Sequence, residues 1–387
     1  MGPFKVCGFD FKTVEEESAI IHLMKRLLDE RSALLQFKET FLIIKCYPDV
    51  GYPKIASWNL EENSECCSWD GIKCNEDTGS VIKLDLRLSC LKGSINSSST
   101  LFNLVHLQWF CLAYNDFSYS QIPYAVKNRS KLSYLDLSRC KFSGQIPSEM
   151  LELSRLESLD LSDFGGMLQL QQPGLRSLVD KLTKLKRLDL SWVNISSSIP
   201  NSLGNLSSLT DLSLIHCQLQ GVIPSSLGNL FKLASLDISS NHFLGDLPIS
   251  IGNLGNLQYL SVSSCQFSDQ VQSSLSNLTH LKSLDLSDSK ISGHNSDSLS
   301  WLPKLTKLTD LYLDNSNLVE KREDQSSESI TFAFDWKIVL TGFVSGLIVG
   351  VILGNEYFTK IVEWFATNNL GWQLKTAIKR KTWGHIN

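Results

Sequence analysis

The middle of the chain repeats one pattern of apolar and polar residues. Between residues 185 and 293 the frame L-x-x-L-x-L-x-x-[N/C/S]-x-[LIF]-x-G-x-[IL]-P recurs about every 24 residues. The central leucines of successive units are Leu188, Leu212, Leu236, Leu260 and Leu284, and Pro200, Pro224 and Pro248 keep the same step. The L-x-L alternation predicts a short strand whose leucines face a core. No single unit can bury its leucines alone, so each must stack on its neighbours.

This periodicity predicts an α/β fold, a leucine-rich-repeat solenoid. We expect a curved parallel sheet on the concave side and short 3-10 or irregular segments on the convex side. About ten units fill residues 81–318, from the strand at Leu84 to a decayed last unit at Leu308–Leu313. Between Phe164 and Leu182 the period breaks, and we expect the extra residues, 165–174, to form a convex-side loop.

One polar position in the frame predicts how each strand turns away. Asn241 occupies it in one unit, where a buried amide can hydrogen-bond loop backbone groups that otherwise lack partners. Cys140, Cys217 and Cys265 hold the same position in other units. Because units one step apart place these sulfurs in separate layers, we expect small buried thiols there, with no disulfide and no metal.

Two features resemble the plant-type leucine-rich-repeat ectodomains. The G-x-[IL]-P ending is similar to theirs, in which the chain continues into a second short strand. Residues 29–80 resemble the N-terminal cap of plant leucine-rich-repeat receptors, with an amphipathic helix at 29–38 and the run Cys66-Cys-Ser-Trp-Asp-Gly-Ile-Lys-Cys74. A cap is needed because the first repeat would otherwise expose a slice of core.

The resemblance implies two disulfides in this cap. Cys67 with Cys74 is the first pair. The family's partner for Cys66 lies just before the helix, where this chain has Arg26, and Cys46 is the nearest substitute. A tight cysteine cluster in an extracellular setting favours disulfides over zinc, and no second C-x-x-C is present to complete a zinc site.

The two ends of the chain differ from the repeats. Residues 1–28 form an atypical segment without the apolar run of a signal peptide, which suggests a displaced start. Residues 319–336 read as an acidic juxtamembrane linker, 337–357 as one C-terminal transmembrane helix, and 358–387 as a short cytoplasmic tail. The predicted helix carries glycine at every fourth position, a pattern typical of helix packing in membranes. These glycines are Gly342, Gly346, Gly350 and Gly354.

Five N-glycosylation sequons lie in or beside the repeats. They begin at Asn96, Asn128, Asn194, Asn205 and Asn277. A chain rich in serine and asparagine contains some sequons by chance. Their number, and the loop or convex positions predicted for most of them, nevertheless favour passage through the secretory route.

The residues indicate binding and no catalysis. A net charge of -4 gives no electrostatic case for nucleic acid. We find no catalytic constellation, no metal site and no cofactor motif. Aspartates such as Asp189, Asp237 and Asp285 recur at one position, which argues for architecture. The phase of the repeats places a set of larger side chains on the concave surface, where exposed aromatics are typical binding anchors. These candidates are Trp109, Tyr114, Tyr134, Arg139, Trp192, Tyr259 and Tyr312, and Lys186 and Arg187 offer further charge for an acidic ligand.

Taken together, the chain resembles a plant leucine-rich-repeat receptor-like protein of the disease-resistance type, without a kinase. The resemblance implies a single-pass protein of the plasma membrane with its N-terminus outside. It also implies an extracellular peptide, protein or glycan ligand, and signalling through a leucine-rich-repeat receptor kinase adaptor that meets the membrane helix. The short array suggests a truncated gene product. Two alternatives stay open: a non-signalling decoy or pseudogene product, and an inhibitor of secreted polysaccharide hydrolases.

Overall fold

The computed structural model describes residues 30–46, 51–59, 65–128, 131–267, 273–289 and 301–314. All of them belong to one compact unit, residues 1–321. The predicted segments 1–28, 319–336, 337–357 and 358–387, including the glycine stripe, lie outside the described residues. No helix within the described ranges has the length and apolar character that a bilayer crossing requires.

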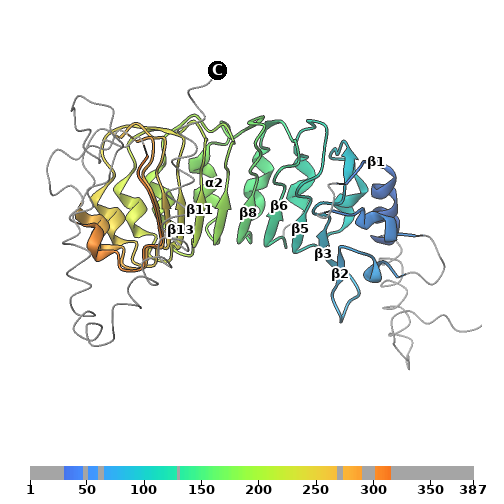
Figure 1. The fold of residues 1–387 in the computed structure, drawn as a ribbon. Helices are drawn as coiled ribbons and strands as arrows, with labels where there is room; N and C mark the ends of the chain where they lie inside the picture. Colours follow the sequence, from blue (N-terminus) through green and yellow to red (C-terminus); the bar gives the residue numbers. More distant parts are fainter. Residues whose placement is uncertain are drawn as a thin grey trace, which may run out of the picture. The chain divides into compact units, whose positions relative to one another are not determined.

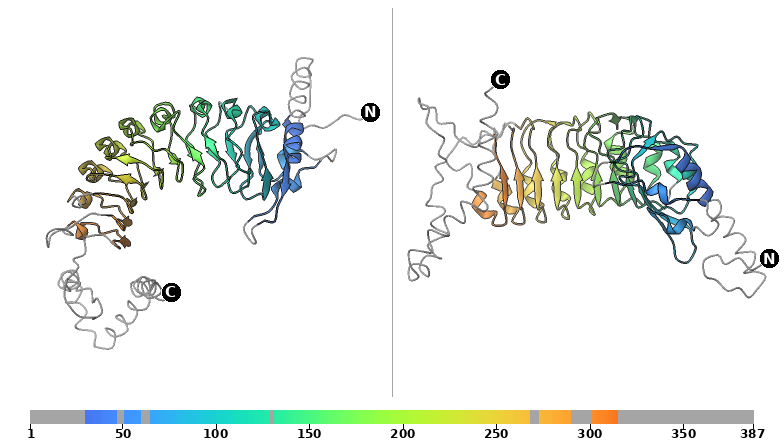
Figure 2. Two further views of the ribbon diagram at one scale, coloured as in Figure 1. Left: turned by 90° about the horizontal axis from the view of Figure 1, so that it is seen from above. Right: turned by 45° about the vertical axis from the view of Figure 1, so that its right-hand side comes forward.

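One sheet of 11 strands dominates the described part of the chain, and its strands line the inner side of the arc in Figure 2. Ten of them are the strands of the predicted repeats, parallel and in sequence order (Figure 1). They are β3 (Val81–Asp85), β5 (Trp109–Cys111), β6 (Tyr134–Asp136), β8 (Ser158–Asp160), β10 (Arg187–Asp189), β11 (Asp211–Ser213), β13 (Ser235–Asp237), β15 (Tyr259–Ser261), β16 (Ser283–Asp285) and β17 (Asp310–Tyr312). Strand β2 (Ile72–Cys74) closes the cap end, antiparallel to β3. The predicted parallel sheet is therefore confirmed.

The register explains why the period is so strict. Leu188 pairs with Leu212, which pairs with Leu236, and the column continues through Leu260 to Leu284. All five side chains are at most 1% exposed. Each leucine thus fills the space between its neighbours in the adjacent repeats, and a shift by one residue would turn the whole set toward water.

Short 3-10 helices cover the convex side. They are η3 (Thr100–Asn103), η4 (Tyr124–Asn128), η5 (Ser148–Glu152), η6 (Asn201–Asn205), η7 (Ser225–Asn229), η8 (Ile249–Asn253), η9 (Ser273–Asn277) and η10 (Leu302–Lys304). Adjacent repeats approach so closely here that glycine is required. A Cβ on Gly228 would lie 2.3 Å from the carbonyl oxygen of Ser250, and Gly204 and Gly252 meet the next repeat in the same way.

A second row of very short strands lies between the sheet and the convex helices. Its strands are β4 (Leu91–Gly93), β7 (Gly144–Gln145), β9 (Leu168–Gln169), β12 (Gln220–Gly221) and β14 (His242–Phe243). The inserted segment at 165–174 joins this row through β9, which pairs with β7. Helix α2 (Leu175–Lys181) follows on the convex side. The expected convex loop is thus wrong, because Leu168 and Leu170 are buried and draw the insertion into the second row.

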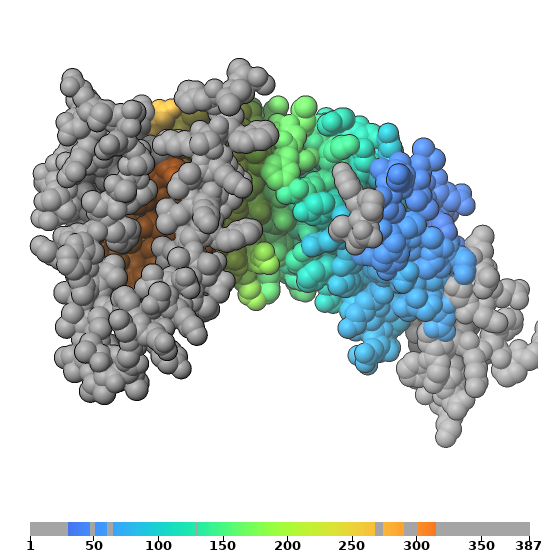
Figure 3. Space-filling view, in the orientation of Figure 1, coloured from blue at the N-terminus to red at the C-terminus, as the bar shows by residue number. Residues whose placement is uncertain are grey.

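The cap packs as an apolar layer against the first repeat. Residues 30–39 are helical, and η1 (Lys54–Ser57) and η2 (Cys66–Ser68) follow. The rings of Trp58 and Trp69 stack at 5.7 Å between centroids, and both side chains are buried. The space-filling view shows the cap and the first repeats as one continuous surface (Figure 3). This layer covers the slice of core that β3 would otherwise expose.

Two disulfides staple the cap, and one differs from our expectation. Cys67 is bonded to Cys74, with 5.5 Å between their Cα atoms. Cys46 is bonded to Cys90, so the suggested pair of Cys46 with Cys66 is wrong. The reason lies in β1 (Phe41–Ile43), which pairs antiparallel with β4. The ladder continues with Ile44 N–H donating to the Cys90 carbonyl at 2.9 Å, which brings Cys46 beside Cys90.

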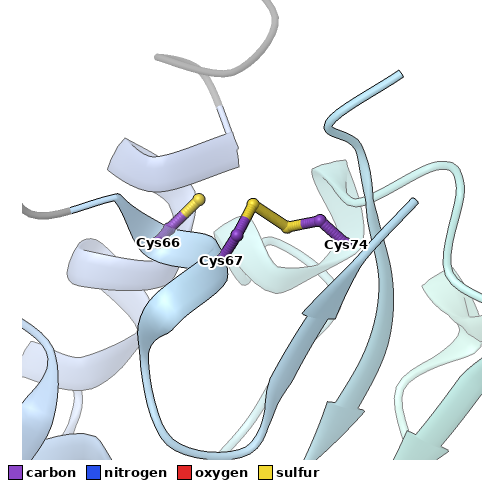
Figure 4. Close-up of side chains that lie close together, drawn as sticks. All are labelled: Cys66, Cys67 and Cys74. Atoms are coloured by element: carbon purple, nitrogen blue, oxygen red, sulfur yellow. A yellow bond between two sulfur atoms is a disulfide. The ribbon is translucent and has the colours of Figure 1, made fainter. Parts of the chain in front are cut away.

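Cys66 is buried beside the other cap disulfide. Its sulfur and those of Cys67 and Cys74 lie within 4.8 Å of one another (Figure 4). Zinc requires thiolate ligands, and the sulfurs of Cys67 and Cys74 are bonded to each other. This cluster is therefore a structural staple of the cap.

Candidate functional site

Each concave strand ends in a turn that a buried polar side chain holds in place. The Asn241 amide nitrogen donates to the carbonyls of Leu214 and Ile238 at 2.7 and 2.9 Å. Its amide oxygen accepts from the backbone N–H groups of Cys217 and Leu219 at 3.1 and 3.0 Å. This single side chain satisfies backbone groups of two repeats, which fixes the turn at the edge of the concave face.

Cysteines do part of the same work in other repeats. The thiols of Cys140 and Cys217 donate to the carbonyls of Leu112 and Leu190 at 3.0 and 3.1 Å, and Cys265 reaches Ile238 at 3.6 Å. Burial raises the pKa of all three thiols, to about 11 for Cys265, so they remain protonated donors at neutral pH. They serve the fold and not a reaction.

The concave face of the first repeats carries a stacked aromatic pair. Trp109 on β5 and Tyr134 on β6 lie 3.4 Å apart between ring centroids, with their planes 4° from parallel. The Lys83 ammonium lies over the Trp109 ring, 4.6 Å from its centroid. Arg87 pairs with Asp136 and also donates to the Tyr134 hydroxyl at 3.3 Å. Both rings are half-buried, so the pair is a firmly held surface.

A row of large side chains, here called the edge row, follows the edge of the sheet where the strands end. Arg139 lies between two rings, 5.0 Å from the centroid of Tyr114 and 3.9 Å from that of Phe164. Trp192 continues the row, 5.6 Å from Phe164 and 4.1 Å from His216. Tyr114 and Phe164 are 41% and 56% exposed. Sequence reasoning found Tyr114, Arg139 and Trp192. It missed Phe164, which joins Arg139 to Trp192, and His216, which extends the row beyond Trp192.

Of the two residues that were not predicted, His216 could have been found from the sequence and Phe164 could not. His216 holds the same repeat position as Trp192, so the phase of the frame would have revealed it. Phe164 lies at the start of the insertion, where the phase is lost. The remaining candidates lie apart from this region: Tyr259 is on β15, with its hydroxyl donating to Asp237 at 3.0 Å, and Tyr312 is on β17, 42% exposed. Five of the seven candidate ligand-binding residues therefore lie in the half of the sheet nearer the cap, between β5 and the turn after β10.

Between the two aromatic rows runs a ladder of aspartates. Asp136, Asp160 and Asp189 stand in register on β6, β8 and β10. Each accepts hydrogen bonds from the serine two residues later, as Ser162 donates its N–H and hydroxyl to Asp160 at 3.0 and 2.7 Å. Burial, followed by repulsion from Asp189, raises the pKa of Asp160 to about 7. The pKa of the Asp160 carboxyl therefore lies near neutral pH, in the centre of an acidic concave face.

Replacing Asp160 by asparagine should stabilise the fold in neutral solution. The pKa of Asp160 in the folded chain is above its ordinary value of 3.8, so the folded state retains a proton that the unfolded chain has lost. Stability from this group is complete below pH 4 and is lost as the pH rises to about 7. Asparagine keeps the acceptor oxygen without the charge. Urea unfolding at pH 4, 6 and 8 should therefore show a growing advantage for Asp160→Asn.

The same substitution on β3 is the matched control. Burial alone would raise the pKa of Asp85, but the Lys54 ammonium, 3.3 Å from its carboxylate, brings the pKa below the ordinary value. Asp85→Asn should therefore destabilise the chain at pH 6 and 8. Equal pH profiles for the two variants would contradict this account.

The sequons occupy different surroundings. Asn205 and Asn277 end η6 and η9 at the same repeat position, and both are exposed on the convex side. Asn96 is exposed as well, whereas Asn194 is half-buried in the second row, where it bridges to Gln169. The side chain of Asn128 lies outside the described residues. Asn205 and Asn277 are the best-placed acceptors for a glycan.

Comparison with known proteins shows which protein families share this architecture. The family model described as "Leucine-rich repeat region" matches residues 158–340. The model "Leucine rich repeat N-terminal domain" matches 27–75, and "Leucine Rich Repeat" matches 131–153. Receptor-like protein 6 of Arabidopsis thaliana is 41% identical over 198 residues, which are 47% of this chain and 20% of that protein. The chain is a leucine-rich-repeat protein similar to the receptor-like proteins of plants.

Two further proteins are similar to parts of this chain. Receptor-like protein Cf-9 of Solanum pimpinellifolium is 38% identical over 199 residues, 49% of this chain and 22% of that protein. The receptor kinase HAESA of Arabidopsis, solved in complex with the peptide hormone IDA and the co-receptor SERK1, is 27% identical with a TM-score of 0.59. That match covers 74% of this chain and 54% of the HAESA chain. The chain spans about a fifth of the length of the curated relatives that it matches.

Proposed function

We propose that this chain is a cell-surface receptor-like protein that binds an extracellular ligand on its concave face and signals, without a kinase of its own, through a partner receptor kinase in plant defence. The observation that carries the proposal is the pair of aromatic rows near the cap. Trp109 and Tyr134 form one, and the edge row from Tyr114 to His216 forms the other. Stacking fixes these side chains before a ligand arrives, so little rotamer entropy is lost on binding.

The family supports the ligand class and the partner. HAESA, which has a similar fold, was solved in complex with a peptide hormone and a co-receptor. A peptide is therefore the first ligand class to test, before a protein or a glycan. The acidic ladder at Asp160 and Asp189 favours ligands with a basic residue, because among the described residues neither carboxylate has an ion-pair partner.

The proposal places the chain in the plasma membrane through the segment predicted at 337–357, with the repeats outside. Gly342, Gly346, Gly350 and Gly354 would lie on one stripe of that helix and let the membrane helix of a kinase approach closely. The mechanism is assembly: the repeats bind the ligand, and the complex recruits the kinase that signals.

The test is co-precipitation of partner receptor kinases from leaves that express the full chain, with and without microbial or cell-wall extract. Trp109→Ala with Tyr134→Ala should abolish the increase that the extract produces, because the stacked surface is lost. Gly346→Leu with Gly350→Leu should reduce recovery under both conditions, because bulk is added where the helices meet.

Each arm has a matched control. Tyr124→Ala with Phe231→Ala removes two rings that are 58% and 59% exposed away from the concave sheet, and should leave the response intact. Val344→Leu with Val351→Leu adds bulk off the glycine stripe. Surface level is measured for every variant. The proposal fails if the concave pair and its control respond alike at equal surface level.

A further inference from the structure

A hollow lies at the opposite edge of the concave sheet, where the strands begin. Its volume is about 410 Å³, and three of its lining residues directly precede β5, β6 and β8. The lining residues are Gln108, Lys131, Ser133, Arg155, Glu157 and Lys184. Three of these residues are cations and one is an acid, so the hollow carries a net positive charge. The aspartate ladder, in contrast, stands where the strands end.

The positive charge is not cancelled within the described part of the chain. Glu157 already pairs with Lys186 at 2.7 Å, which lies outside the lining. Lys131 contacts the His106 ring nitrogen Nδ1 at 2.9 Å, a contact that supplies no negative charge. Among the described residues, Arg155 and Lys184 have no carboxylate within ion-pair distance. Two cations therefore face the hollow with their charges available to a ligand.

Consecutive repeats carry a cation at this position only at the hollow. The residue just before the first leucine of each repeat is Lys131, Arg155 and Lys184 at the hollow, but Ser208, Lys232 and Asn256 in the repeats that follow. A long polyanion would find no continuous row of partners beyond the hollow. A compact anionic group would find its partners within one small space, with the exposed Gln108 amide as a further donor.

The hollow adjoins the stacked aromatic pair. Gln108 and Ser133 immediately precede Trp109 and Tyr134, the first residues of β5 and β6. The Ser133 hydroxyl donates to the Gln108 carbonyl at 3.1 Å, which ties the two repeats together at this edge. A ligand that covers the rings would therefore bring an acidic group on its flank into the hollow.

We propose that this hollow binds a compact oxyanion, a carboxylate, sulfate or phosphate group, carried by the ligand of the concave face. This inference rests on the proposed function and adds the chemistry of one ligand group. Arg155 supplies a planar guanidinium that can bind two oxygens at once, and Lys184 supplies a point charge. Lys186 and Arg187, to which the sequence drew attention, are already paired with Glu157 and Asp211.

The test is calorimetric titration of the purified full chain with sodium sulfate and, separately, with sodium citrate, at constant ionic strength set by chloride. Arg155→Gln with Lys184→Gln removes the two available charges from exposed positions. Lys232→Gln with Lys307→Gln removes two exposed charges from the same repeat position outside the hollow. The first pair should weaken binding about tenfold and the control less than about twofold.

The outcomes distinguish which anionic group the ligand carries. Binding of citrate alone assigns a carboxylate, binding of sulfate alone assigns a sulfate or phosphate ester, and either supports the site if the first variant weakens it selectively. The site is overturned if the wild type binds neither anion, or if the two variants bind equally. The titration needs neither extract nor kinase. If no anion binds selectively but the kinase response is normal, only the proposed oxyanion site is refuted. If the anion binds selectively but no kinase response is seen, only the proposed receptor function is refuted.

Discussion

Replacing Asn241 by alanine should lower the free energy of unfolding by about 3–5 kcal/mol, since several buried backbone groups would each lose a partner worth about 1–3 kcal/mol. The amide donates to the carbonyls of Leu214 and Ile238 and accepts from the N–H groups of Cys217 and Leu219. Asn241 is 2% exposed, so water cannot replace these bonds without opening the repeat. Denaturant unfolding followed by circular dichroism measures the loss.

The chain itself suggests the intermediate variant. Cysteine holds the same position at Cys140 and Cys217, where its thiol donates one hydrogen bond to a carbonyl. Asn241→Cys should therefore recover part of the loss, but not the acceptor for the two N–H groups. Asn256→Ala is the matched control, because that amide also donates to a carbonyl, at 2.7 Å to Phe231, but from an exposed site. Equal losses at Asn241 and Asn256 would count against the ladder as the source of stability.

Removing the disulfide between Cys46 and Cys90 should cost more than removing the one between Cys67 and Cys74. The two bonds span 44 and 7 residues. Because a crosslink limits the unfolded chain more when its loop is longer, we expect roughly 4 kcal/mol for the first and roughly 2 kcal/mol for the second. The variants are Cys46→Ala with Cys90→Ala and Cys67→Ala with Cys74→Ala, compared by urea unfolding.

Mass spectrometry of a non-reduced digest provides the direct check of connectivity. Peptides that contain Cys46 and Cys90 should be recovered as one crosslinked species. Reduced wild type is the control, and it should unfold at least as easily as either variant. Recovery of Cys46 joined to Cys66, or a larger loss for the short loop, would refute the pairing and its expected rank.

The sequence predicted the features that recur in every repeat and did not predict the contacts that occur only once. The period placed every concave strand, because each leucine must meet its counterpart in the next repeat. The period also found Trp109 and Tyr134 as outward residues, but phase gives only the face. That their rings touch depends on the register of β5 against β6. The partner of Cys46 depends on β1 pairing with β4, a contact made once in the described chain and without any periodic signal.

The sequence did not predict the hollow for a similar reason. Lys131, Arg155 and Lys184 lie 24 or more residues apart in sequence, and each alone is an ordinary surface cation. Stacking of the repeats brings them to one place, and the ion pair between Glu157 and Lys186 decides which charges stay available. Such a balance requires side-chain contacts, which a linear pattern does not contain.

The third residue after the concave strand adopts a left-handed backbone in repeat after repeat, although it is not glycine. Its φ is +59° at Tyr114, +51° at Arg139, +70° at Trp192 and +53° at His216. None of these four side chains is β-branched, so none carries the largest backbone cost at a positive φ. These positions are therefore exchangeable: a tyrosine, an arginine, a tryptophan or a histidine fits the same geometry. A new side chain at one of these positions can therefore keep the backbone of its repeat, but it changes the ring and cation contacts with the adjacent repeats. A single substitution in the edge row should thus alter the ligand surface of more than one repeat.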